Sequence, residues 1–175
     1  MNGKMNLFTM NQRSQKMNNE LVNFHLALGT DDAGRYITEI TAFSFQELEF
    51  THDYIQWLFP LPEPSAYAPD APVLDEETLA EFRKRPALSH SINYSAQVML
   101  RFYGTNNHWI TRNNHNYLRI SRIIRCLALV GLEELANDFY NSMKKLVTNI
   151  DGEVTPETLK YWEAATKGLL PEREG

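Results

Sequence analysis

Histidine and arginine side chains at close spacing are the residues of this sequence best suited to chemistry. His115, Arg119 and Arg122 recur at intervals of four and three residues within NNHNYLRISRI. At about 3.6 residues per turn, this spacing places all three on one stripe of a helix, and Cys126 falls on the same stripe. Guanidinium groups bind carboxylates, backbone carbonyls or anionic ligands, and an imidazole titrates near neutral pH. The stripe therefore indicates a binding site or a set of contacts between helices.

The structural alternative makes the arginine pair a clamp between helices. Glu47, Glu49 and Asp53 are acids that can pair with Arg119 and Arg122. A structural pair should have every guanidinium donor satisfied within the protein, whereas a binding site should leave donors free. The sequence leaves both alternatives open.

A second candidate group lies in the segment HDYIQWLFPLPEPS. His52 and Gln56 are four residues apart, so they share a helical face, and Trp57 offers an aromatic wall. His52 and Asp53 point about 100° apart on a helix and cannot form a catalytic dyad. We expect this polar edge to face the arginine stripe. The candidate ligand-binding residues are His52, Gln56, Trp57, His115, Asn116, Arg119 and Arg122.

Three classes of function fit these residues. The preferred one is a binding module for an extended peptide or a small anionic ligand. An enzyme is the second, with His115 or His52 as general base and Arg119 stabilising a developing negative charge in a pocket lined by Trp57. A protein interaction domain is the third, and it predicts an exposed apolar patch around a proline-rich segment. The five histidines have no metal-binding spacing, and no phosphate-binding loop or serine-hydrolase motif occurs, so we expect no metal and no cofactor.

Charge and composition indicate which partners and which cellular compartment to expect. The net charge of -5 and the pI of about 5.5 give no strong nucleic-acid signal. Cys126 is the only cysteine, which excludes an internal disulfide and favours a buried thiol in a reducing, cytoplasmic compartment. No segment has the roughly 20 apolar residues of a membrane span. The oligomeric state stays open.

Apolar periodicity predicts an all-α fold, a single irregular helical domain of about six or seven helices. Residues 1–18 are expected to be a flexible leader, 19–170 the domain and 171–175 a tail. Prolines at 60, 62, 64 and 69 predict an extended strap over residues 61–71. Residues 30–41 are undecided between extended chain and a helical turn. The expected helices are 20–28 stopped by Gly29, 45–59 after the Ser44 cap with a possible break at 51–53, 76–83 after Asp75, 88–103 stopped by Gly104, a helix from Asn113 or Asn114 to Gly131, 132–147, and one opened by Thr155 and Pro156.

The motifs also carry a family resemblance. HDYIQWLFPLPEPS, then RFYG, NHNYLRISRIIRCLALVGLE and LKYW, resemble the conserved region of the opioid growth factor receptor family. The resemblance spans Leu21 to Ala165, and DDAGRYITEI resembles the bacterial branch of the family. It implies a soluble all-helical domain whose animal relatives are described as receptors for a small opioid peptide, acting in growth regulation and associated with the nucleus. It implies no catalytic residues.

Overall fold

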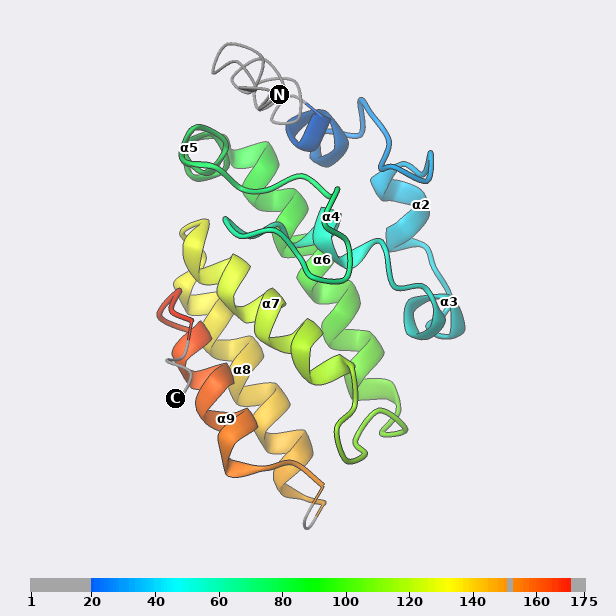
Figure 1. Ribbon diagram of the computed structural model, residues 1–175, viewed down its shortest axis with the longest axis vertical. Coiled ribbons are helices and arrows are strands. Elements are labelled where there is room, and N and C mark those ends of the chain that lie inside the picture. The colour runs from blue at the N-terminus through cyan, green and yellow to red at the C-terminus, as the bar shows by residue number, and fades with distance from the viewer. Residues whose placement is uncertain (1–19, 151–152, 171–175) are drawn as a thin grey trace, which may run out of the picture.

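The computed structural model describes residues 20–150 and 153–170, and these are almost entirely helices and loops (Figure 1). The all-α prediction is confirmed, since the described part contains one isolated β-bridge, between Thr30 and Tyr36. The expected leader and tail lie outside the described residues. Residues 20–25 are helical. The named helices are α2 (Ile37–Thr41), α3 (Phe45–Phe50), α4 (Ile55–Leu58), α5 (Glu76–Lys84), α6 (Pro86–Thr105), α7 (Asn116–Leu129), α8 (Glu133–Thr148) and α9 (Pro156–Ala165).

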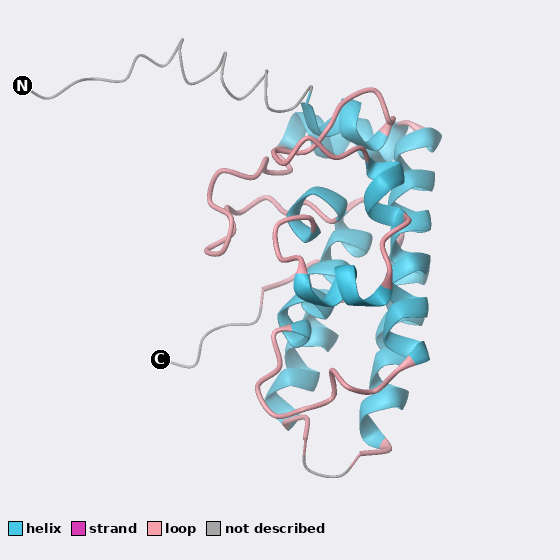
Figure 2. Cartoon of the chain, turned by 90° about the vertical axis from the view of Figure 1, so that its right-hand side faces the viewer, coloured by secondary structure: helices cyan, strands magenta, loops and turns pink. Residues whose placement is uncertain are grey.

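Helix α7 is central to the arrangement, because it packs against α8, α9 and α6. The short helices α2 and α3 lie on one side of α6 and α7, and α8 and α9 lie on the other (Figure 1). Helices α6 to α9 contact one another and alternate in direction along the chain (Figure 1). Seen from the side, the long helices run mostly along the long axis of the molecule (Figure 2). The irregular part is the first half, with its short helices and long loops, whereas α6 to α9 are arranged up and down rather than at the mixed angles that were expected.

The first half contains more and shorter helices than the sequence predicts. The first helical segment ends at His25, and the chain reverses at Ala27, whose φ of 58° is left-handed, before Gly29 is reached. Residues 30–41 combine both alternatives, a turn followed by α2. The Asp31 carboxylate accepts from the amides of Ala33 and Arg35 and organises that turn.

The predicted helix 45–59 is two helices, α3 and α4. Ser44 and Glu47 form the expected capping box at the start of α3. The chain then leaves helical geometry at Thr51, so the suspected break is real. Apolar Leu58 and Phe59, both fully buried, anchor the end of α4, and Pro60 follows them.

The strap crosses the face of the molecule turned toward the viewer in Figure 1. Its ends are joined by a hydrogen bond from the Leu74 amide to the Leu61 carbonyl. Pro62 and Pro64 flank Glu63, which is half-exposed. The segment is therefore a loop whose ends meet, with a turn closed by the hydrogen bond from the Ala71 amide to the Ala68 carbonyl, and not the extended connection that the prolines predict.

The second half follows the predicted helices with shifted ends. Helix α6 begins at Pro86 and runs through Gly104, so Gly104 does not stop it as expected. Helix α7 begins at Asn116, where the Asn114 side chain accepts from the Asn116 amide and caps the first turn. Gly131, with φ of 85°, ends α7 as predicted. Thr155 caps α9 as predicted.

Two groups of aromatic rings fill the core. One joins Phe24, His25, Trp57 and Phe82, with Phe24 and Trp57 ring centroids 5.2 Å apart. The other runs from Tyr103 through Trp109 and Tyr117 to Trp162, with successive centroids 5.0 to 6.2 Å apart. Edge-to-face contacts of this kind add to the free energy of burial. The indole of Trp162 donates to the Tyr117 carbonyl, which fixes α9 against α7.

Cys126 is buried in the core, as predicted, and burial raises the pKa of its thiol to about 12. The thiol is therefore protonated and unreactive at neutral pH. Across the described helices, none is long and apolar enough to cross a membrane.

Candidate functional site

Arg119 of α7 binds the carbonyl end of α3. Its terminal nitrogens donate to the carbonyls of Leu48 and Thr51, each at 2.7 Å, and to that of Glu49 at 3.5 Å. The last carbonyls of a helix lack partners within the helix, and a cation there is favourable. The predicted salt bridges to Glu47, Glu49 or Asp53 are wrong for Arg119, because backbone oxygens take their place.

A buried polar network surrounds this guanidinium. Tyr103 donates to the Asn116 side-chain oxygen at 3.2 Å, and the Asn116 amide nitrogen donates to the Glu49 carboxylate at 3.0 Å. The same Asn116 oxygen lies 3.4 Å from Arg119, whose guanidinium also stacks over the Tyr54 ring. Burial raises the pKa of Tyr54 to about 12 and raises the pKa of Tyr103 well above its ordinary value, so both phenols stay protonated donors. The network holds α3 and α7 in a fixed geometry.

Two exposed imidazoles lie on top of this network. The rings of His52 and His115 are 5.0 Å apart. Nδ1 of His52 lies 3.1 Å from an Arg119 nitrogen. Arginine only donates, so His52 Nδ1 accepts and the proton of the neutral ring sits on Nε2.

His115 has the complementary arrangement. Its Nε2 lies 3.5 Å from the Glu49 carboxylate, which favours an N–H directed at Glu49 and leaves the other ring nitrogen as an acceptor. Partial burial, with the charges of Arg119 and His52, lowers the pKa of His115 despite the opposing effect of Glu49. With both rings neutral, the pair therefore presents one donor and one acceptor.

Gln56 and Trp57 lie elsewhere, so the polar edge expected to face the arginine stripe is incomplete. Gln56 is buried, donates to the Ser65 hydroxyl of the strap at 3.4 Å, and has a side-chain oxygen without a partner in the described part of the chain. Trp57 is 2% exposed and packs in the Phe24 ring group. Its carbonyl accepts from His25.

Arg122 and Arg125 continue the series along α7. Arg122 donates to the Phe59 carbonyl at the end of α4, and Arg125 donates to the Gly168 carbonyl beyond α9, both at 3.0 Å. Arg125 also holds both Glu63 carboxylate oxygens, at 2.6 and 2.8 Å. Three arginines at intervals of three residues thus reach the carbonyl ends of three other helices.

The sequence did not indicate Arg125 and Glu63 as members of these contacts, and Glu49, expected as a salt-bridge partner of the arginines, instead accepts from Asn116 and contacts His115. A signal for Arg125 was available, because it extends the interval from Arg119 to Arg122 by one more step. No sequence signal identifies Glu63 as its partner, because the pairing depends on how the strap crosses α7.

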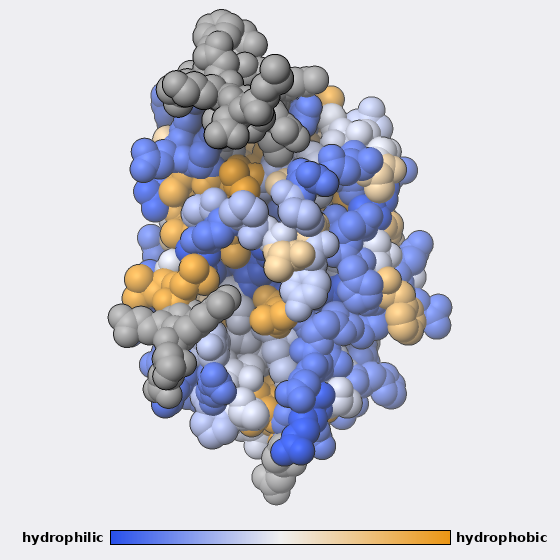
Figure 3. Space-filling model, in the orientation of Figure 1, coloured by the Kyte–Doolittle hydropathy of each residue, from blue (hydrophilic) through white to orange (hydrophobic). Residues whose placement is uncertain are grey.

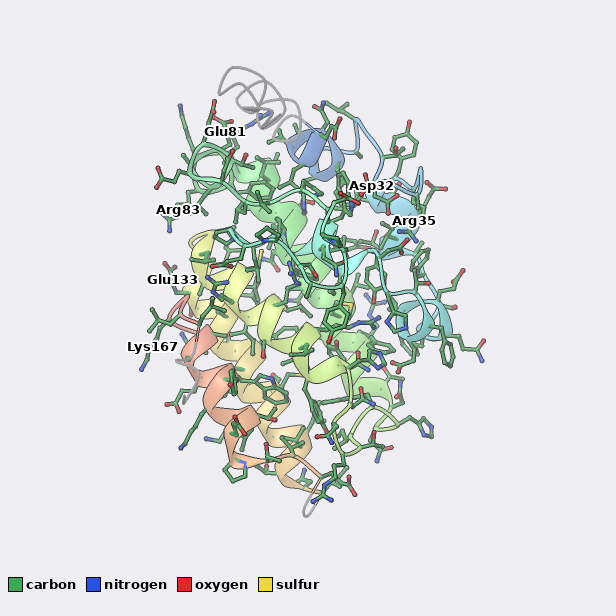
Figure 4. The ribbon with its side chains drawn as sticks, viewed as in Figure 1. Asp32, Arg35, Glu81, Arg83, Glu133 and Lys167 are labelled. Carbon is green, nitrogen blue, oxygen red and sulfur yellow. The ribbon has the colours of Figure 1, made fainter. Side chains whose placement is uncertain are left out.

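The hollows of the surface do not coincide with the predicted site. One of about 310 Å³ is bordered by Trp57 and by polar residues near Asp31 and Asp32. A more open one of about 610 Å³ follows α5. Figure 4 shows Asp32 and Arg35 on the α2 side of the molecule and Arg83 on the opposite side, beside α5. Of the seven candidate residues, His52, His115, Asn116 and Arg119 come together, while Arg122, Gln56 and Trp57 are separate.

The fold and these contacts define an all-helical domain in which one arginine-bearing helix contacts a proline strap through Arg125 and has two exposed histidines near its start. Residues 16–110 match the model of the opioid growth factor receptor conserved region, so the chain belongs to that family. No solved structure gives a significant match.

Several animal proteins are similar to this chain. Opioid growth factor receptor-like protein 1 of Mus musculus is 29% identical over 153 residues, which cover 74% of this chain and 32% of that protein. The Xenopus tropicalis protein of the same name is 32% identical over 151 residues, covering 74% and 29%. The opioid growth factor receptor of Rattus norvegicus is 32% identical over 108 residues, covering 51% and 18%. The chain thus spans about a third or less of the length of these relatives.

Proposed function

We propose that this chain is a peptide-binding module whose ligand contacts the exposed edges of His52 and His115. The observation that carries the proposal is the pair of imidazoles 5.0 Å apart, one presenting a donor and the other an acceptor. A peptide backbone offers a carbonyl and an amide at comparable spacing. Two relatives are named receptors for an opioid growth factor, which supports a ligand-binding role.

Rigid support favours binding at this place. Arg119 is 5% exposed and bonds to His52, while His115 contacts Glu49, whose carboxylate accepts from the buried Asn116. A preorganised site loses less conformational entropy when a ligand binds. Arg119 itself serves the fold, since both of its terminal nitrogens are bonded within the protein. We therefore propose a peptide rather than an anion as the ligand at this edge. The sequence further suggests that the protein is cytoplasmic and belongs to the bacterial branch of the family, and we include both in the proposal.

The enzyme alternative retains one supporting observation. His52 and Arg119 are within hydrogen-bond distance, as that alternative requires. The same hydrogen bond makes His52 Nδ1 an acceptor for the fold, and Trp57 lines no pocket with these residues. The interaction-domain alternative is supported by Tyr67 of the strap, which is 80% exposed.

A selection from a random heptapeptide phage library tests the proposal. Selected peptides are synthesised, and their dissociation constants are measured for the wild type, His52→Ala, His115→Ala and the control His108→Ala. His108 is an exposed histidine that leaves the network intact. We expect each site variant to weaken binding by about fivefold to tenfold, as for the loss of one hydrogen bond, and the control to bind normally. Selected peptides that bind all four proteins equally well would refute the assigned edge.

A further inference from the structure

Arg122 is the least satisfied of the three arginines. Within the described residues it makes one hydrogen bond, from Nη1 to the Phe59 carbonyl. It is half-buried, and burial lowers its pKa. A guanidinium that has lost water without gaining acceptors is unfavourable, so this position suits an acceptor supplied from outside.

Glu63 is the carboxylate that pairs with these arginines. It binds Arg125 through both oxygens and also interacts electrostatically with Arg122. Two guanidinium groups thus share one carboxylate. This region therefore carries a net positive charge, although the protein as a whole is acidic. The side chain of Glu63 is 46% exposed and that of Arg125 is 9% exposed, so a carboxylate from solution would reach Arg125 by displacing Glu63.

Exposed apolar side chains occur on the same two elements as these charges, helix α7 and the strap. Leu118, one helical turn before Arg122, is 59% exposed, and Tyr67 of the strap is 80% exposed. On the face of the molecule drawn in Figure 3, hydrophobic residues border a hydrophilic hollow near the middle. A carboxylate next to an apolar side chain is the ligand chemistry that matches such a surface.

We propose that Arg122 and Arg125 form a carboxylate-binding site for an acidic peptide, and that Glu63 of the strap occupies it in the free protein. The inference rests on the proposed peptide-binding function and adds the class of peptide. The paired hydrogen bonds between Arg125 and Glu63 show the geometry that a ligand carboxylate would adopt. Glu63 competes with the ligand, so the strap sets the apparent affinity.

Three related peptides test this site. Acetyl-Leu-Tyr-Glu-Leu-Ser-amide carries a side-chain carboxylate, its glutamine analogue carries none, and the glutamine analogue with a free carboxyl terminus carries a terminal one. Binding is measured by calorimetry and by the NMR signals of the arginine Nε–H groups. We expect the glutamate peptide to bind about tenfold more tightly than its neutral analogue. The third peptide shows whether a terminal carboxylate is also accepted.

Matched variants separate the site from bulk charge. Glu63→Gln should raise the affinity for the glutamate peptide severalfold, while Glu163→Gln, the same charge change on an exposed residue of α9, should not. Arg122→Gln should lower it about tenfold, Arg122→Lys less, and the exposed control Arg112→Gln little. Circular dichroism confirms that each variant is folded.

The outcomes distinguish the two proposals. Equal affinities for Glu63→Gln and Glu163→Gln, or for Arg122→Gln and Arg112→Gln, overturn the carboxylate site. The absence of any preference for the glutamate peptide in the wild type and in Glu63→Gln overturns it too. In each of these cases, peptides from the phage selection that depend on His52 and His115 would still support the proposed function.

Discussion

Some buried polar side chains of this domain make hydrogen bonds that require one protonation state, and His25 is one of them. His25 is 4% exposed, lies within hydrogen-bond distance of Ser91 through Nδ1, and donates from Nε2 to the Trp57 carbonyl. Burial lowers its pKa to about 4, against the opposing effect of that carbonyl. The neutral ring is therefore part of the folded state.

His25 should make the protein acid-sensitive. The unfolded chain binds a proton at His25 near the ordinary histidine pKa of 6.5, whereas the folded chain does so only near pH 4. Unfolding thus takes up protons between these values, and the free energy of unfolding falls as pH falls, by about 3 kcal/mol in total from this group. Urea denaturation at pH steps from 7 to 4 measures it. In His25→Gln the dependence should be weaker by that amount, and parallel curves for the two proteins would contradict the assignment.

Arg119 should be the costliest arginine to remove. Arg119→Ala leaves the carbonyls of Leu48 and Thr51 without their charged donor, at about 1.5–3 kcal/mol for each such hydrogen bond. Urea denaturation should show a loss of about 3–5 kcal/mol. The control Arg101→Ala, at an exposed position on α6, should change stability by less than about 0.5 kcal/mol. Similar losses in both variants would mean that the hydrogen bonds to α3 contribute little.

At the scale of elements, the strap and the helix ends are held mainly by α7. Arg125 contacts both Glu63 of the strap and the Gly168 carbonyl after α9. Arg83 of α5 in turn donates to the carbonyl of Leu129, the last residue of α7. Side chains thus replace the missing intrahelical partners at several helix ends.

The strap contact should be modest in energy. Because Glu63 is 46% exposed, we expect a coupling energy of about 1 kcal/mol or less in a double-mutant cycle of Arg125→Ala and Glu63→Ala. Arg125→Ala alone should cost more than Glu63→Ala, since it also removes the donor to Gly168. The cycle of Arg85 and Glu81, an exposed pair at 3.6 Å, serves as the control and should give a smaller coupling. A strap coupling no larger than the control value would refute this contribution.

The elements also show what sequence reasoning can reach. Caps and stops with their own chemistry were predicted correctly, including Ser44, Thr155 and Gly131. Gly104 does not stop α6, which continues for one more residue to Thr105. The first helix ends earlier than expected, because the chain turns at Ala27 and not at Gly29. Gly104 and Ala27 are both exposed, and a Cβ at Gly104 would meet nothing, so packing does not explain either position; a glycine is only a weak signal for a helix end.

For the candidate site, sequence spacing identified the stripe of α7 but not its partners. Arg119 was expected to meet carboxylates and instead meets carbonyls of α3, because its partners depend on tertiary placement. Trp57 follows Gln56 directly, yet it packs against Phe24 while Gln56 meets the strap. Neighbours in a helix point in different directions, and only the fold decides what each one meets. The binding role of the seven candidates stays a prediction.

At the scale of the whole molecule, α7 is surrounded by other elements. Ile123, Ile124 and Leu127 are fully buried. We expect their amides to exchange with deuterium most slowly of the described residues, near the rate set by global unfolding, because α7 cannot open while its neighbours stay packed. The five-residue helix α2 should exchange fastest among the helices. Hydrogen exchange followed by NMR measures both, and equal rates in α7 and α2 would contradict this order.

The three arginines of α7 also make its register a shared property of the fold. One extra residue inserted between Arg119 and Arg122 would turn the later side chains by about 100° relative to the earlier one. The bonds to Phe59 and Gly168 could then form only if α4, the strap and α9 all moved together. A substitution in this family can thus be absorbed at one contact, whereas an insertion or deletion within α7 would have to be absorbed at every contact at once.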